Sequence, residues 1–177
     1  MDPEALIRST QARLLAVADG PPLVEDPWPA RAAARLARTK AFVGYPESEV
    51  AAAERALGVQ FPAMFRTYLL RIGRTPGDLF VGSDLASLDP TSSNSISRFR
   101  SEAIALMGDA AHGLPSRAVI FLFHQGYTFL FFDADGGSDA PVFQFVEGEA
   151  QPKQIAASFA ELVENELALH ESNRRLL

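Results

Sequence analysis

Apolar residues recur every three or four positions in two neighbouring short segments, residues 46–57 and 62–72. This spacing places them on one side of a helix, so both segments are predicted to be amphipathic helices. Gly58 and Gly73 directly follow the two segments and favour the end of each helix. The region therefore predicts a pair of helices joined by a tight turn.

The first 40 residues carry a simpler helical pattern. Asp2 and Pro3 suit the N-cap and the first position of a helix, which we expect to run to about Ala18. A proline-rich connection, Gly20–Pro29, follows this helix. A second helix, rich in alanine and arginine, is predicted over residues 30–39.

Beyond residue 75 the pattern changes to short runs rich in β-branched and aromatic residues. Three such runs are Ala118–Phe123, Tyr127–Phe132 and Pro141–Val146. The turn between the first two runs is short and contains Gly126, which is typical of a hairpin. A longer turn, residues 133–140, joins the second run to the third. We therefore expect a meander of three antiparallel strands.

Weaker signals lie on both sides of this meander. Leu79–Val81 predicts a short strand, residues 87–97 are rich in serine and predict an exposed loop, and residues 98–107 predict a short helix. Ser158 and Glu161 form a capping box that opens a terminal helix. The order of helices, strands and helix predicts the α+β fold class, with helices packed on an antiparallel sheet.

Adjacent aromatic residues raise a question about the two faces of this sheet. Phe131 and Phe132 must point to opposite faces, because successive side chains of a strand alternate. Either both faces are covered by other elements, or one of the two rings is exposed and marks a contact surface.

The composition excludes several classes of protein. No cysteine occurs among the 177 residues, which excludes disulfides, thiol catalysis, iron–sulfur ligation and all-cysteine zinc sites. No apolar run approaches the ~20 residues of a membrane span. The N-terminus lacks the basic stretch and the apolar core of a signal peptide. We therefore expect a cytoplasmic protein that has no membrane partner.

The charge is concentrated in the second half of the chain. The 22 acidic and 16 basic side chains give a net charge of −6, and residues 101–177 alone carry 11 acidic against 4 basic side chains. Such a surface repels nucleic acid and attracts basic partners. The alternative is a solvated surface that serves solubility alone.

Residue types that support catalysis or metal binding are present without the spacing that the chemistry needs. The histidines His112, His124 and His170 form no metal-binding pair. The turn that begins at Asp133 lacks the ligands and the glycine of a calcium loop at the required positions. No phosphate-binding loop and no serine nucleophile motif occurs. We expect no catalytic residue, no cofactor and no metal, although a carboxylate pair at catalytic distance is invisible in a sequence.

The predicted helix pair carries a recognisable signature. Residues 46–73 read Pro46-x-x-x-Val50-x-x-x-Glu54-x-x-Leu57-Gly58-x-x-Phe61-Pro62-x-x-Phe65-x-x-Tyr68-Leu69-Leu70-x-x-Gly73. This run resembles the opening signature of the SUKH superfamily, the Smi/Knr-like domains. In that signature a helix with an internal Glu ends at Leu-Gly, and Leu-Pro then precedes a second helix that ends at Asn-Gly. Phe61 replaces the usual Leu here, and Ile72 replaces the usual Asn. The resemblance covers about residues 42–170, so we expect residues 1–40 to be a helical extension of a SUKH-like domain at residues 41–177.

The resemblance implies a protein-binding module without catalytic residues shared across the family. Bacterial members resemble immunity proteins of polymorphic toxin systems, which bind and neutralise a toxin, often a nuclease, encoded beside them. Fungal relatives resemble scaffolds in cell-wall regulation. We therefore expect a bacterial immunity protein that binds a basic toxin. The alternatives are a regulatory scaffold with an endogenous partner, and a small-ligand-binding protein or hydrolase that uses carboxylates.

The contact surface is expected in the acidic late region of the chain. The candidates carry either a carboxylate in or after a turn or an aromatic ring on a strand, and they are Asp133, Asp135, Asp139, Glu147, Glu149, Tyr127 and Phe132. The carboxylates would steer a basic partner toward the surface, and the rings would anchor the centre of the interface. The alternative for each residue is a turn former, a solvated charge or a core residue.

Overall fold

Six helices and seven strands make up the part of the chain that the structure, a computed structural model, describes: residues 1–19, 29–108 and 113–175. In chain order they are α1 (Pro3–Asp19), α2 (Pro29–Thr39), β1 (Phe42–Val43), α3 (Glu47–Leu57), α4 (Ala63–Arg71), β2 (Thr75–Pro76), β3 (Asp84–Leu85), α5 (Ile96–Met107), β4 (Ala118–His124), β5 (Thr128–Asp133), β6 (Val142–Val146), β7 (Lys153–Ala156) and α6 (Phe159–Arg175). Helices together with antiparallel sheets confirm the α+β fold class. His112 and most of the predicted connection, residues 20–28, lie outside the described residues.

The main sheet has the strand order β3-β4-β5-β6-β7, and all neighbouring strands are antiparallel. The predicted meander forms its centre as β4, β5 and β6, and the short edge strands β3 and β7 were not predicted. The prediction of a strand at Leu79–Val81 was wrong, because these residues form a turn in which Phe80 has a φ of +62°. Leu79 and Phe80 are both buried, so their apolar character reflects packing against the core.

The predicted helix pair is confirmed as α3 and α4. Gly58 ends α3 in the left-handed conformation, with a φ of +67°, which glycine adopts without steric cost. The side chain of Glu54, in the last turn of α3, accepts a hydrogen bond from the backbone N–H of Phe61, with 2.8 Å between Oε1 and N. Glu54 therefore fixes the short segment that leads into α4, which gives a physical reason for a glutamate inside the first helix.

We expect Glu54→Ala to lower the free energy of unfolding by about 1–2 kcal/mol, because the Phe61 N–H loses its acceptor in a half-buried setting. Glu54→Gln should cost less, since the amide oxygen accepts the same bond. Urea unfolding of both variants measures the difference. Equal losses would indicate that the charge interaction with Arg66, at 3.5 Å between Nε and Oε1, carries the effect.

A bulge at Phe121 decides which side chains face each side of the sheet. The pairing of β4 with β5 shifts by one residue around Phe121, so the alternation of side chains restarts after it. Phe121 stacks on Phe132, with ring centroids 5.7 Å apart. Phe123, two residues later, instead contacts Phe99 of α5 on the opposite side of the sheet, at 4.9 Å.

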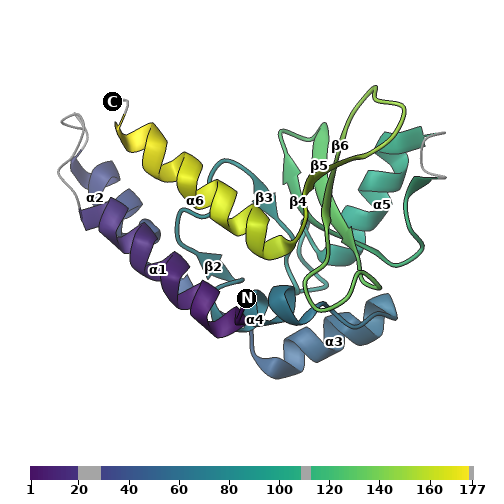
Figure 1. Cartoon of the computed structure of the whole chain (residues 1–177), viewed down its shortest axis with the longest axis horizontal. Helices are drawn as coiled ribbons and strands as arrows, with labels where there is room; N and C mark the ends of the chain where they lie inside the picture. Colours follow the sequence, from purple (N-terminus) through teal and green to yellow (C-terminus); the bar gives the residue numbers. More distant parts are fainter. Residues whose placement is uncertain (20–28, 109–112, 176–177) are drawn as a thin grey trace.

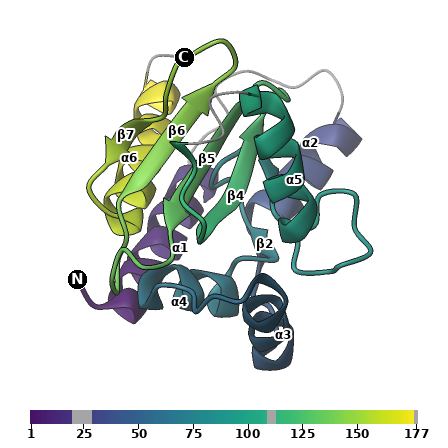
Figure 2. The same ribbon diagram turned by 90° about the vertical axis from the view of Figure 1, so that its right-hand side faces the viewer.

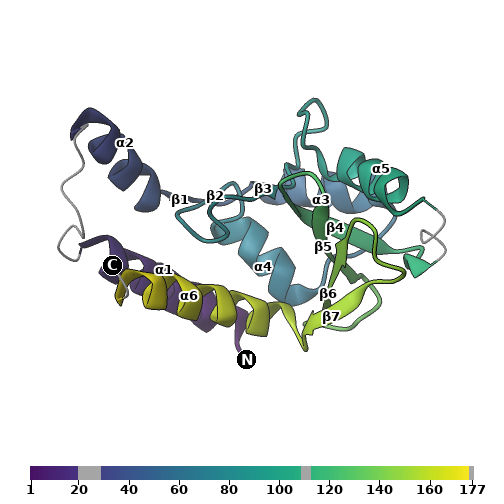
Figure 3. The same cartoon turned by 90° about the horizontal axis from the view of Figure 1, so that it is seen from above.

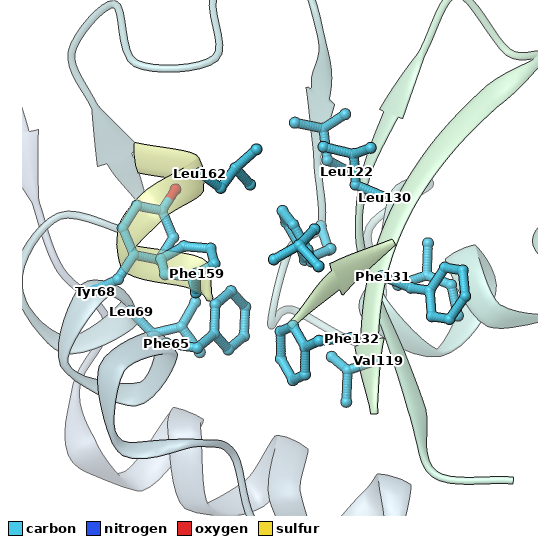
Figure 4. Close-up of a cluster of buried hydrophobic side chains, with 14 of the residues drawn as sticks. Phe65, Tyr68, Leu69, Val119, Leu122, Leu130, Phe131, Phe132, Phe159 and Leu162 are labelled. Atoms are coloured by element: carbon cyan, nitrogen blue, oxygen red, sulfur yellow. The ribbon is translucent and has the colours of Figure 1, made fainter. Parts of the chain in front are cut away.

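Both faces of the sheet are covered. On one face, Phe132 lies against Phe65 of α4, which in turn contacts Phe159 of α6 (Figure 4). On the other face, which carries Phe131, α5 lies across β4. In Figure 2, α1 and α6 lie on the opposite side of the sheet from α5. Phe131 and Phe132 are both buried, so the first of the two alternatives for these residues is confirmed.

The N-terminal helix α1 belongs to the same core. It lies beside α6 and packs against α4 (Figures 1 and 3). Leu6 and Ile7 of α1 are buried. Arg13 binds Glu164 and Glu171 of α6, with 2.7 Å between Arg13 Nε and Glu171 Oε1. The predicted division of the chain near residue 41 stays a prediction, but α1 does not stand apart from the rest of the molecule.

Candidate functional site

Phe132 cannot contact a partner, so the prediction that it is an exposed anchor was wrong. Its side chain is 0% exposed, and its ring centroid lies 4.9 Å from that of Phe65. The helices α4 and α6 cover the face of β5 on which Phe132 lies. The other predicted aromatic residue, Tyr127, is 42% exposed.

The remaining predicted residues fall into two groups at opposite ends of β5. Tyr127 directly precedes this strand, and its carbonyl accepts a hydrogen bond from the backbone N–H of Glu147, at 2.8 Å. The turn that contains Asp133, Asp135 and Asp139 follows the other end of the strand. Six residues of strand span about 20 Å, so the two groups do not form one site.

The carboxylates of the turn at residues 133–140 have partners within the molecule. Asp133 Oδ1 accepts a hydrogen bond from the Asp135 backbone N–H. Asp135 forms an ion pair with Arg117, at 2.7 Å. Asp139 Oδ1 accepts a hydrogen bond from the backbone N–H of Ala160 in the first turn of α6. The turn therefore has a structural role, and its contact with a partner stays a prediction.

The other end of β5 borders a hollow of about 830 Å³ that is open to solvent. Residues of β3, the loop before α5, α5 itself, the end of β4, the β4–β5 turn and the turn after β6 line this hollow. They are Asp84, Ser93, Asn94, Phe99, Glu102, Ala105, Leu106, Phe123, Gly126 and Glu147. We call this hollow the acidic groove. Phe99, Leu106 and Phe123 give it an apolar wall.

Three carboxylates from three separate segments of the chain, β3, α5 and the turn after β6, line the acidic groove. Asp84, Glu102 and Glu147 are all exposed, and no ion pair joins any of them to a basic side chain within the described part of the chain. No lysine or arginine is among the described lining residues. By contrast, Glu49 and Glu164 each pair with an arginine. The groove therefore combines uncompensated negative charge with apolar surface.

The loop at residues 87–95 is held in place beside the groove. Asn94 donates a side-chain hydrogen bond to the carbonyl of Leu85, at 2.6 Å, and Ser95 is buried. The loop is thus less exposed than its serine-rich sequence predicts. Hydrogen bonds from Thr91 lower the pKa of Asp89 in the same loop, so this carboxylate stays ionised.

Sequence reasoning found only part of this site. Of the predicted contact residues, Glu147 lines the groove and Tyr127 directly follows the lining residue Gly126, whereas Glu149 forms an ion pair with Lys153. Contact of Glu147 and Tyr127 with a partner stays a prediction. Asp84 and Glu102 were missed, because the groove exists only once α5 packs across β4. One local signal was available: Glu102 follows Phe99 by three residues, which places both on one side of α5.

A serine and a histidine lie within hydrogen-bond distance of each other in the described part of the chain. Ser83 Oγ lies 3.1 Å from Nδ1 of His124, but no carboxylate within the described ranges forms a hydrogen bond or ion pair with His124, and a catalytic triad needs such a third group. No cluster of three or more His, Asp or Glu side chains that could hold a metal ion occurs in the part of the chain that the structure describes. Within the same residues, no helix has both the length and the apolar character needed to span a bilayer.

A family model for the SMI1/KNR4 family (SUKH-1) matches residues 44–165, which is more than half of the chain. This chain belongs to the SMI1/KNR4 family. The SUKH-1 match contains all residues of the acidic groove and confirms the resemblance seen in the sequence. Helices α1 and α2 precede the SUKH-1 match. A search of curated proteins found no match to the chain. Membership of the SUKH-1 family supports the general prediction that this chain is a protein-binding domain.

Proposed function

We propose that this protein is a cytoplasmic immunity protein that binds and neutralises a basic bacterial toxin, without catalysis, and that the acidic groove is the contact surface. The observation that carries the proposal is the groove itself. It joins three carboxylates that have no basic partner among the described residues to an apolar wall.

The groove has the two properties that a fast and tight inhibitor needs. Uncompensated carboxylates attract a basic protein over long distances and raise the rate of association. The apolar wall, with Tyr127 beside it, supplies surface that a partner can bury at the centre of the interface. Toxins that act on nucleic acid are commonly basic, because they bind phosphates.

The first test is co-expression with the neighbouring gene, which the proposal expects to encode the toxin. We expect the protein to restore growth and to form a complex with the toxin that moderate salt weakens. Failure to relieve toxicity would contradict the proposal. Capture of a resident regulatory protein at stoichiometric amounts would favour a scaffold, and saturable binding of a small molecule in the groove would favour a ligand-binding protein.

The second test reverses two of the charges of the groove. We expect Asp84→Lys together with Glu147→Lys to lower the association rate constant with the partner about tenfold or more at low ionic strength. The effect should shrink at high salt, because screening weakens steering. Surface plasmon resonance over a salt series measures both.

A matched control changes the net charge by the same amount elsewhere. Asp19→Lys together with Asp135→Lys removes two exposed ion pairs, with Lys40 and Arg117, each worth about 0–1 kcal/mol. This control should associate nearly as fast as the unmodified protein. If the control slows association more than the groove variant does, the turn at residues 133–140 is the contact surface and the assignment of the groove is wrong.

A further inference from the structure

A second, smaller hollow lies between α1, α6 and the turn that follows β2. Its volume is about 120 Å³, whereas pockets for drug-sized ligands usually measure about 300–1,000 Å³. A hollow of this size holds a single side chain or a few heavy atoms. It shares no lining residue with the acidic groove.

A buried carboxylate, that of Asp78, forms part of its wall. Asp78 is only 7% exposed, and its Oδ2 accepts a hydrogen bond from the hydroxyl of Thr39, at 2.7 Å. Its Oδ1 is buried and has no hydrogen-bond partner within the described residues. A buried carboxylate oxygen without a donor is costly, so a cationic donor that enters the hollow gains more here than at a solvated carboxylate.

Oδ1 itself has almost no contact with solvent, so a ligand reaches it after the Asp78 carboxylate has turned toward the hollow. The χ2 angle of aspartate is broad, which makes such a rotation inexpensive. The hydrogen of the Thr39 hydroxyl can reorient toward the carboxylate oxygen that then faces it.

Two titratable groups of α6 also line the hollow, Glu166 and His170. Burial raises the pKa of Glu166, and the charge of His124 on β4 acts in the opposite direction. A cation that binds in the hollow stabilises the ionised form of Glu166. No lysine or arginine occurs among the described residues that line the hollow.

The rest of the wall is apolar. Leu79 is buried. Val81 and Leu169 are 56% and 54% exposed, which places them among the most exposed large hydrophobic residues of the described chain. An apolar rim around a buried acid suits a side chain that has an apolar stem and a cationic end.

We propose that this hollow binds the guanidinium group of an arginine side chain on a protein partner, with Asp78 and Glu166 as the acceptors and Val81 and Leu169 against the arginine stem. Arginine fits better than lysine because the guanidinium is more weakly hydrated and offers five donors to two carboxylates. The statement that the arginine belongs to a protein rests on the proposed function.

The small hollow and the acidic groove are close neighbours along the chain. Val81 lines the small hollow and Asp84 lines the groove. Three residues of chain span at most about 11 Å, so these two residues lie close together. An arginine in the small hollow would then anchor a partner whose remaining basic surface faces the groove.

The test uses the isolated protein and small probes, so it does not depend on the identity of any partner. Proton–nitrogen NMR spectra are recorded during titration with n-butylguanidinium chloride, n-butylammonium chloride and the neutral n-butylurea. We expect saturable shifts with n-butylguanidinium at the backbone amides of Leu79–Val81 and of residues 166–170, with a dissociation constant in the millimolar range. The urea should give none, and the ammonium should bind more weakly.

Two variants connect the shifts to the carboxylates. Asp78→Asn keeps an oxygen that accepts the bond from Thr39, so the fold should persist, and we expect guanidinium binding to weaken about tenfold or more. Glu166→Gln should weaken it by a smaller factor. Asp89→Asn is the matched control at an exposed aspartate outside the hollow, and it should bind as the unmodified protein does.

Several outcomes would overturn the inference. Equal shifts with the urea would exclude a role for charge, and equal affinity for the ammonium would exclude arginine as the preferred occupant. Shifts confined to the lining of the acidic groove would place the cation there. If the small hollow binds guanidinium but the protein fails to relieve toxicity, this inference stands and only the proposed function is rejected.

Discussion

Phe132→Ala is expected to lower the free energy of unfolding by about 3–5 kcal/mol, the usual cost of removing a buried aromatic ring. Phe132 is 0% exposed and contacts the rings of Phe65 and Phe121. Removing it takes away these contacts and leaves a cavity between the sheet and α4. Folded domains are stable by only about 5–15 kcal/mol, so this single change removes a large share of the total.

Urea unfolding followed by circular dichroism measures this loss, and Tyr127 provides the control. Tyr127 is the other aromatic residue that the sequence placed at the contact surface, but it is 42% exposed. Tyr127→Ala should therefore change stability by about 0.5 kcal/mol, as is usual for a surface position, and should weaken partner binding instead. A loss below about 1 kcal/mol for Phe132→Ala would contradict its place in the core.

Gly44→Ala is expected to lower the free energy of unfolding by about 3 kcal/mol or more. A Cβ atom at this position would lie 1.8 Å from the carbonyl oxygen of Leu70 and 2.3 Å from its carbonyl carbon. Both are backbone atoms of α4, so neither can move aside as a flexible side chain would. The segment before α3 has to separate from α4, and the hydrogen bond from the Tyr45 N–H to the Leu69 carbonyl, at 2.9 Å, is then lost.

Gly58→Ala is the matched control for this clash. Gly58 has a φ of +67°, and a Cβ atom there would meet no other atom within 4 Å, so alanine at this position suffers backbone strain alone. Strain of this kind costs about 1–2 kcal/mol. Urea unfolding of the two variants should rank Gly44→Ala as clearly more damaging. The reverse order would show that the segment before α3 does not lie as close to α4 as the structure indicates.

Local signals in the sequence predicted most of the regular structure. Helix α3 is specified by its apolar spacing and by Gly58, and α6 by the capping box, in which Ser158 accepts a hydrogen bond from the backbone N–H of Glu161. The strands β4, β5 and β6 each have their own run of β-forming residues. These signals act within a few residues of the chain, so they can be read without knowledge of the tertiary fold.

Features that depend on long-range packing could not be predicted in this way. The acidic groove forms only because α5 crosses β4, which brings Glu102 near Asp84 and Glu147. The burial of Phe132 depends on α4 and α6, and an alternating pattern alone allows either face of a strand to be exposed. Asp135 and Asp139 resemble binding residues by their charge, yet their partners Arg117 and Ala160 lie elsewhere in the chain.

The exposed carboxylates of the groove contribute little to the stability of the fold, which has an evolutionary consequence. The backbone beneath them is fixed by other groups: β3 pairs with β4, and the Glu147 N–H donates to the Tyr127 carbonyl. The side chains of Asp84, Glu102 and Glu147 are exposed, and substitutions at such positions usually change stability by no more than about 0.5 kcal/mol. Mutations in the rim can therefore accumulate while the fold persists, which lets a lineage exchange one binding partner for another without rebuilding its core.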